Sequence, residues 1–144
     1  MKPIIVSNRL PIKLEKIEGK WQILPGSGGL VTALAPVLRG SKSTWVGWPG
    51  AAWSDKLNKL LEQSTADIGY RLQRVDLTDK DIAGFYRGFS NESVWPLFHD
   101  LLDHCDFETR HWETYQKVNY KFAVEAARAV TEEDFIWVQD YHLM

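Results

Sequence analysis

The sequence predicts an α/β fold in which helices flank a wound parallel β-sheet. Short runs rich in β-branched and aromatic residues alternate along the chain with longer segments whose apolar residues recur at helical spacing. This alternation is typical of βαβ units, in which each helix returns the chain so that successive strands lie parallel. With 144 residues, of which 44% are hydrophobic, the chain can bury one core. We therefore expect one Rossmann-like sheet with an inserted β-hairpin.

The first 50 residues predict two strands of the sheet, a hairpin and a helix. The β-branched run at residues 3–7 predicts a buried strand. Residues 12–24 alternate apolar and polar side chains on both sides of Glu18-Gly19, which indicates a β-hairpin. A glycine-rich loop, a helix and a strand that runs into a turn follow at residues 25–29, 30–38 and 43–50.

The rest of the chain predicts three helices and two further strands. Ser54 and Thr78 are N-cap candidates for helices over residues 54–63 and 78–91. In the second of these, the Gly-Phe-Ser-Asn segment at residues 88–91 is expected to break regular structure. The remaining elements are a long amphipathic helix from Phe107 to Ala126 and strands at residues 70–77 and 135–138.

The bulk composition argues against several classes of partner. The net charge of -2 creates no field that favours nucleic acid or an anionic membrane. No apolar run approaches the roughly 20 residues of a membrane span. The N-terminal apolar run is too short for a signal peptide, and the single cysteine, Cys105, excludes an internal disulfide. We expect a cytoplasmic protein that binds neither nucleic acid nor membrane.

The histidines and the cysteine do not predict a metal centre. His104, Cys105 and His111 lie close together in the sequence, but no second cysteine accompanies them, so the ligand spacing of a zinc site is missing. The sequence therefore predicts no metal, and no cofactor is expected.

Two motifs near the N-terminus could bind a phosphate. Arg9 comes just after the first predicted strand, where a guanidinium can bind a phosphate through two parallel hydrogen bonds. A surface arginine that pairs with a carboxylate would show the same pattern. The loop Gly-Ser-Gly-Gly-Leu at residues 26–30 precedes a helix whose free N–H groups attract anions. It matches neither a dinucleotide fingerprint nor a Walker loop, and a plain flexible loop fits it equally well.

Aromatic and acidic side chains provide two further candidates. The stretch 85–99 is dense in aromatic residues, and its Tyr86 and Trp95 suit the wall of a sugar-binding site. A core patch beneath a loop is the alternative. Asp140 follows the last predicted strand, where a carboxylate can accept hydrogen bonds from ligand hydroxyls or orient a base. A helix cap for the following segment is the alternative there.

Taken in order, six blocks of the sequence resemble one enzyme family. The blocks are IIVSNRLP, GSGGLVTAL, WVGWPG, FYRGFSNESVWPLFH, YQKVNYKFA and WVQDYHLM. They resemble the N-terminal half of trehalose-6-phosphate synthases, which are retaining glycosyltransferases of the two-Rossmann-domain (GT-B) architecture. The resemblance covers essentially the whole chain. It implies transfer of glucose from UDP-glucose to glucose 6-phosphate, with the α-configuration of the donor retained.

The resemblance also assigns roles to residues that face the acceptor sugar. It implies that Arg9 contacts the phosphate of glucose 6-phosphate, and that Tyr86, Trp95 and Asp140 bind its sugar. In the family mechanism the leaving diphosphate takes the proton of the acceptor, so the protein contributes mainly positioning and charge stabilisation. Asp140 is then a catalytic residue that orients the acceptor rather than a strict general base.

For the donor side, the resemblance matches Gly28 and Gly29 to paired glycines whose backbone meets the diphosphate and sugar of UDP-glucose. Trp48 lies in a matching block, either as a direct contact or as support for the site, and His142 is expected to support the site as well. The residues that read the donor nucleotide fall outside the matched blocks, so UDP, GDP and ADP stay open.

The resemblance further implies that residues 1–144 form an incomplete N-terminal, acceptor-side Rossmann-like domain without the C-terminal nucleotide-sugar domain. We expect little or no synthase activity from such a fragment, and self-association through surface that the missing parts would cover. Two alternatives stay open. One is a stand-alone sugar-phosphate binding or regulatory module. The other is a related GT-B transferase with another phosphorylated acceptor, such as a glycerol phosphate.

Overall fold

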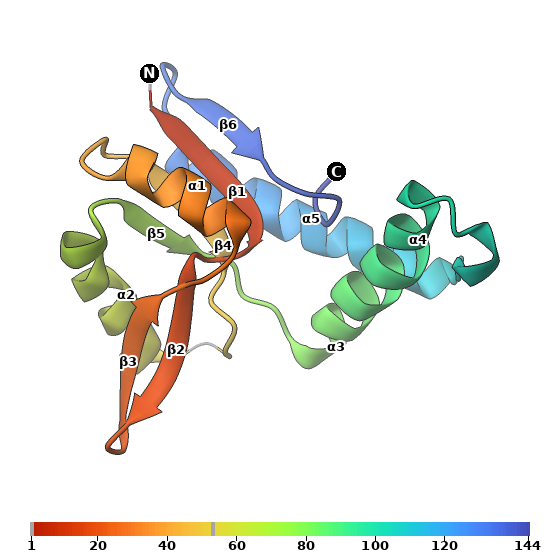
Figure 1. Cartoon of the computed structure of the whole chain (residues 1–144), viewed down its shortest axis with the longest axis horizontal. Coiled ribbons are helices and arrows are strands. Elements are labelled where there is room, and N and C mark those ends of the chain that lie inside the picture. Colours follow the sequence, from red (N-terminus) through yellow and green to blue (C-terminus); the bar gives the residue numbers. More distant parts are fainter. Residues whose placement is uncertain (1, 53) are drawn as a thin grey trace.

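A computed structural model describes residues 2–52 and 54–144 and shows a parallel four-stranded sheet with a separate hairpin (Figure 1). The strand order in the sheet is β5-β4-β1-β6, and every neighbouring pair is parallel. The predicted α/β fold with an inserted hairpin is therefore confirmed. The strands are β1 (Pro3–Arg9), β2 (Ile12–Ile17), β3 (Lys20–Pro25), β4 (Thr44–Trp48), β5 (Arg71–Arg74) and β6 (Phe135–Val138).

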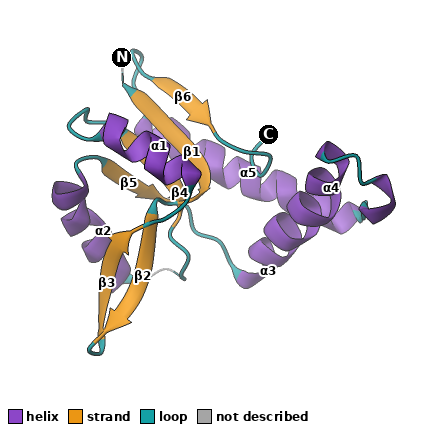
Figure 2. Ribbon diagram, viewed as in Figure 1, coloured by secondary structure: helices purple, strands orange, loops and turns teal. Residues whose placement is uncertain are grey.

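Helices cover both faces of the sheet, as the ribbon coloured by secondary structure shows (Figure 2). They are α1 (Gly29–Leu38), α2 (Asp55–Ile68), α3 (Asp79–Asp81), the π-helix η1 (Ile82–Val94), α4 (Trp95–Phe98), the 3₁₀ turn η2 (Leu102–His104) and α5 (Thr109–Ala129). None of the helices in residues 2–52 and 54–144 combines the length and the apolar composition that a membrane span requires.

Two apolar cores form because side chains of a strand point alternately to opposite faces of the sheet. Ile4 and Val6 of β1 pack with α5 and η1, whereas Ile5 between them packs with α1 and α2. β1 is flanked on both sides, by β4 and by β6. Its buried, unbroken apolar run is what a central parallel strand requires.

The hairpin β2–β3 turns at the predicted dipeptide. Glu18 and Gly19 have φ angles of 49° and 77°, and the strands pair from Ile17–Lys20 outward. Two central residues with positive φ are the geometry of the turn that matches the right-handed twist of the strands. The hairpin projects from the end of β1 and does not join the sheet (Figure 1).

The prediction that residues 88–91 break regular structure is wrong. The chain is helical from Asp79 to Phe98, through α3, η1 and α4. Gly88 is needed for packing rather than for a break, because an added Cβ would lie 2.7 Å from the imidazole ring of His111 on α5. Tertiary packing therefore overrides the local preference of glycine for irregular structure.

The two edges of the sheet differ in chemistry. At the β5 edge, Arg71, Gln73 and Arg74 are polar and take part in hydrogen bonds or ion pairs. At the β6 edge, all four side chains of Phe135–Val138 are apolar and 44% to 49% exposed. Together with α5, β6 lines an apolar groove of about 760 Å³. The β6 edge is therefore an uncovered apolar surface.

Candidate functional site

A pocket of about 430 Å³ lies at the carboxyl ends of β1 and β6. The two strands are parallel neighbours, with Val6 opposite Val138, and the backbone N–H of Gln139 donates to the carbonyl of Val6 at 2.8 Å. Residues that follow the two strands therefore meet at one edge of the sheet. The polar side chains that line the pocket are those of Ser7, Asn8, Arg9, Lys13, Ser27, Tyr86, Asp140 and His142.

Arg9 presents an unpaired guanidinium to this pocket. The guanidinium carbon lies 4.7 Å from the ring centre of Trp48. A Cβ on Gly50 would collide with the guanidinium, so glycine makes room for it. Within the described residues the side chain makes no hydrogen bond or ion pair. Burial lowers the pKa of Arg9, and the nearby Tyr86 opposes this shift.

Asp140 stands two residues after the end of β6, in a strained backbone conformation. Its φ of 76° lies in the left-handed region, which non-glycine residues rarely adopt. The backbone N–H of Tyr141 donates to its Oδ1 at 2.7 Å, which holds the carboxylate beside its own backbone. Oδ2 lies 3.2 Å from Nδ1 of His142. Strain of this kind is common where a side chain must point at a ligand.

His142 is the most buried titratable side chain of the pocket, with 7% exposure. Its ring stacks on Tyr86 at a centroid distance of 5.3 Å and on Tyr141 at 4.1 Å. The contact of Nδ1 with Asp140 is close but falls short of a well-aligned hydrogen bond, and Nε2 has no partner among the described residues. Burial lowers the pKa of His142, and Asp140 opposes this shift.

The other predicted site residues lie at different distances from the pocket. Trp48 lies against the guanidinium of Arg9, in a supporting position. Gly28 is the N-cap of α1 and has a φ of 118°, and Gly29 begins the helix. Both adjoin the pocket-lining Ser27, and a Cβ at either position would meet open space. Trp95 does not line the pocket and instead stacks on His99 at 4.1 Å.

Asn8, Lys13 and Ser27 line the pocket but were not singled out from the sequence. Asn8 is only 9% exposed, and its Oδ1 has no partner within the described part of the chain. A buried acceptor without a partner is rare in proteins and indicates a missing ligand or water. The sequence signal that could have identified Asn8 was its position between Ser7 and Arg9 in the block IIVSNRLP. No feature of the sequence indicated that Lys13 lines the pocket, because Lys13 belongs to the hairpin.

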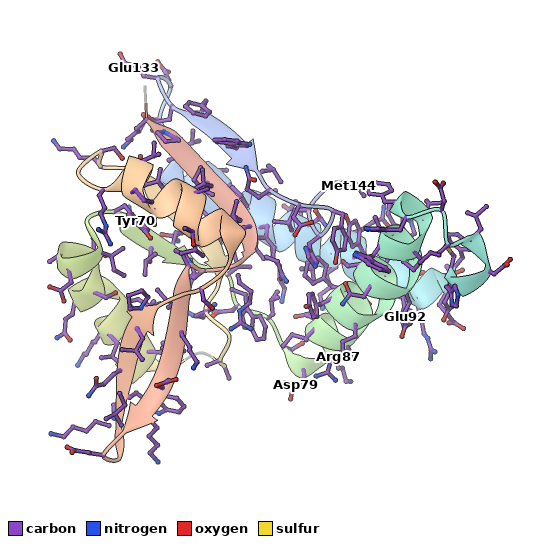
Figure 3. All side chains as sticks on the ribbon, viewed as in Figure 1. Tyr70, Asp79, Arg87, Glu92, Glu133 and Met144 are labelled. Atoms are coloured by element: carbon purple, nitrogen blue, oxygen red, sulfur yellow. The ribbon has the colours of Figure 1, made fainter. Side chains whose placement is uncertain are left out.

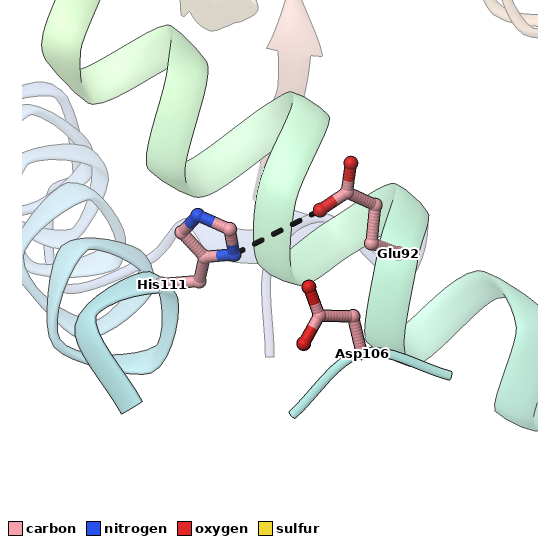
Figure 4. Close-up of side chains that lie close together, drawn as sticks. All are labelled: Glu92, Asp106 and His111. Carbon is pink, nitrogen blue, oxygen red and sulfur yellow. Dashed lines mark ion pairs between the residues drawn. The ribbon is translucent and has the colours of Figure 1, made fainter. Parts of the chain in front are cut away.

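A separate cluster lies at the far end of η1, where Glu92, Asp106 and His111 place ligand-type atoms within 4.8 Å of one another (Figure 4). Glu92 Oε2 lies 3.9 Å from Nδ1 of His111. Both carboxylates are exposed, and the backbone N–H of Asp106 donates to the carbonyl of Glu92 at 2.7 Å. The contact of Glu92 with His111 joins η1 to α5, and the hydrogen bond from Asp106 joins the loop before α5 to η1, so structural contacts account for this arrangement and we assign no metal to it.

Comparison with known proteins identifies the family. The model of glycosyltransferase family 20 matches residues 1–144. The chain belongs to this family. It is similar to the trehalose-6-phosphate synthase of Mycolicibacterium smegmatis, with 41% identity over 143 residues, 97% of this chain and 27% of that protein. The synthase of Mycobacterium tuberculosis strain H37Rv is 40% identical over 143 residues, again covering 97% of this chain and 29% of the relative.

Solved structures agree with this family assignment. The α,α-trehalose 6-phosphate synthase of Burkholderia multivorans superposes with a TM-score of 0.72 at 30% identity, covering 99% of this chain and 28% of that one. The Burkholderia xenovorans α,α-trehalose-phosphate synthase in complex with glucose-6-phosphate gives a TM-score of 0.71 at 28% identity, covering 99% and 29%. The family 20 chain thus spans 27% to 29% of the length of these relatives, and it has the N-terminal fold of their GT-B structures.

Proposed function

We propose that the pocket at the ends of β1 and β6 is the acceptor site of a trehalose-6-phosphate synthase. In this reaction glucose moves from UDP-glucose to glucose 6-phosphate with retention of configuration. The observation that supports it is the composition of one pocket. It combines the carboxylate of Asp140 with three side chains that lack polar partners among the described residues, namely the guanidinium of Arg9 and the buried side chains of Asn8 and His142.

Each of these groups suits one part of glucose 6-phosphate. A guanidinium that is held in place by an aromatic ring can donate two parallel hydrogen bonds to a phosphate. The carboxylate of Asp140 can accept hydrogen bonds from sugar hydroxyls, and the half-exposed ring of Tyr86 can pack against the sugar. Asp140 then acts by orienting the acceptor, because the leaving diphosphate of the donor takes the proton of the acceptor.

The loop before α1 is the proposed donor contact. Gly28 and Gly29 leave open space around the first backbone N–H groups of α1, and no acidic side chain lies in its first turn. Free N–H groups at a helix start favour the diphosphate of UDP-glucose. UDP as the nucleotide is supported by relatives: one Burkholderia vietnamiensis structure is described as a UDP-forming synthase.

A titration tests the acceptor site. We expect residues 1–144 to bind glucose 6-phosphate in isothermal titration calorimetry. Arg9→Ala should weaken binding about tenfold or more, because charged hydrogen bonds contribute about 1.5–3 kcal/mol. The matched control is Arg110→Ala, which removes an exposed arginine at the start of α5 and should leave the affinity unchanged. Absence of saturable binding, or equal affinity in Arg9→Ala, contradicts the proposed site.

The same sample distinguishes the alternatives. We propose that residues 1–144 alone produce little or no trehalose 6-phosphate from UDP-glucose and glucose 6-phosphate, since the relatives are more than three times as long. Substantial product would refute this. A stand-alone sugar-phosphate module remains the second candidate, because Arg9 and Asp140 already line one pocket without any further chain. Tighter binding of glycerol 3-phosphate than of glucose 6-phosphate would instead favour a related transferase.

The proposed location is the cytoplasm, where the free Cys105 stays reduced.

A further inference from the structure

We propose that His142 is a positioning residue of the acceptor pocket, which holds the Asp140 carboxylate and the Tyr86 ring in their binding positions. The proposal rests on the proposed function of the pocket. Its basis is that one buried ring touches both exposed candidates: Nδ1 lies 3.2 Å from Asp140 Oδ2, and the ring is stacked on Tyr86 with an interplanar angle of 16°. His142 therefore links the end of β6 to η1.

The segment that carries His142 is fixed on three sides, so the ring has little freedom. The hydroxyl of Tyr115 donates to the carbonyl of Tyr141 at 3.1 Å, and the hydroxyl of Tyr141 donates to Oδ1 of Asn91 at 3.0 Å. The amide of Asn119 donates to the carbonyl of His142 at 3.4 Å. The next residue, Leu143, is buried in the core against α5. The backbone of this segment is thus held by α5, and the side chain of Tyr141 connects it to η1.

This placement decides which nitrogen of His142 carries the proton. A carboxylate beside Nδ1 favours the tautomer in which Nδ1 is protonated and points toward Asp140, which leaves Nε2 as an acceptor. The contact with His142 restrains the side chain of Asp140, whose backbone lies in the left-handed region. The other groups at the ring are Phe85 and Tyr86 from η1 and Tyr141 from its own segment, and Arg9 and Lys13 line the same pocket. None of these is a second carboxylate.

Protonation of His142 would then weaken sugar binding. An imidazolium forms a full ion pair with Asp140 and draws the carboxylate away from sugar hydroxyls. Since the phosphate of the ligand also titrates near pH 6, a comparison of variants is needed. We expect the ratio of wild-type affinity to His142→Asn affinity for glucose 6-phosphate to fall as the pH decreases from 8 to 5. A constant ratio would argue against the inference.

A ligand-free measurement tests the contact with Asp140 directly. Two-bond ¹H–¹⁵N correlation spectra of the imidazole should show His142 protonated on Nδ1 above pH 7. Its pKa should lie below the ordinary value of about 6.5. Asp140→Asn should shift the tautomer toward Nε2. Protonation on Nε2 in the wild type, or no response to Asp140→Asn, overturns the inference whether or not any ligand binds.

Two variants separate a positioning role from simple packing. His142→Phe keeps an aromatic ring against Tyr86 but removes both nitrogens, whereas His142→Asn keeps an N–H near the position of Nδ1. We expect His142→Phe to weaken binding of glucose 6-phosphate about fivefold, and His142→Asn to weaken it less. Binding of inorganic phosphate should stay equal in both, because Arg9 holds the phosphate.

The exposed control, His104→Asn, should match the wild type with both ligands. Wild-type affinity for glucose 6-phosphate in His142→Phe would show that the ring only packs, and would overturn the inference. Failure of the wild type to bind either ligand would instead refute the proposed function, and the spectra would still decide the role of His142.

Discussion

Trp48 determines how the guanidinium of Arg9 faces the pocket. The ring lies 4.7 Å from the guanidinium carbon, and Gly50 leaves room on another side. A cation held over an aromatic ring gains about 0.5–2 kcal/mol, and it loses less freedom when it binds a phosphate. We therefore propose that Trp48 supports phosphate binding through Arg9, although its own Nε1 is buried without a partner among the described residues.

Replacement of this ring tests the contribution. We expect Trp48→Leu to weaken the affinity for glucose 6-phosphate about threefold to tenfold, because the guanidinium loses its support. Fluorescence or calorimetric titration would measure the change. Trp21→Leu removes an exposed tryptophan on the hairpin and serves as the control. A loss in Trp21→Leu as large as that in Trp48→Leu would show a general effect of tryptophan removal.

At the scale of elements, η1 and α5 form the support of the site. η1 carries Tyr86, and α5 fixes the segment after β6 through Tyr115 and Asn119. The two helices approach closely where η1 has glycines, since a Cβ on Gly84 would lie 2.8 Å from the Cβ of Thr114. Asp81 strengthens the same contact. Its carboxylate accepts a hydrogen bond from the backbone N–H of Thr78 in the capping box of α3 and lies 2.6 Å from the ammonium of Lys121 on α5.

This close approach makes Gly84 sensitive to a single methyl group. In an open helix, replacement of glycine by alanine stabilises by about 1 kcal/mol. Here we expect Gly84→Ala to destabilise the fold by about 1–3 kcal/mol, because the methyl group overpacks against Thr114. The matched control is Gly29→Ala in α1, where a Cβ meets open space, and which should not lower the melting temperature. A Gly84→Ala protein as stable as the wild type would contradict the close packing.

At the scale of the whole molecule, the two sheet edges predict different behaviour. The β5 edge carries paired polar groups, whereas the β6 edge and α5 form the apolar groove. We propose that a second copy of residues 1–144 covers this groove, because an exposed apolar strand edge offers unpaired backbone groups to another chain. The paired charges at β5 disfavour that edge as the contact.

Sedimentation velocity over a range of concentrations would detect this association. We expect a concentration-dependent shift from monomer to dimer. Ile136→Glu, on β6 within the groove, should reduce it. Glu133→Lys, in the turn before β6 (Figure 3), should leave it unchanged. A monomer at every concentration, or an equal response of the two variants, would refute the proposed contact.

From the sequence by itself, the alternation of strands and helices and the positions of Arg9 and Asp140 at strand ends could be predicted, and both residues line one pocket. Arg9 ends β1 and Asp140 lies two residues beyond β6, and parallel neighbours bring their carboxyl ends to one edge of the sheet. The prediction of a break within η1 was wrong, because the role of its glycines depends on contacts with Thr114 and His111, some 20 to 30 residues later in the sequence. Local propensity contains no information on such contacts.

Only the tertiary structure decided which side chains share the pocket. It brought Lys13 from the hairpin and Tyr86 from η1 to the ends of the strands, left Trp95 stacked on His99 outside the lining, and buried His142 between two tyrosines. Burial depends on residues that are distant in the sequence but packed in space. The sequence therefore showed which residue types lie at the strand ends. Only the folded chain shows that atoms of Asn8 and His142 have no partner among residues 2–52 and 54–144.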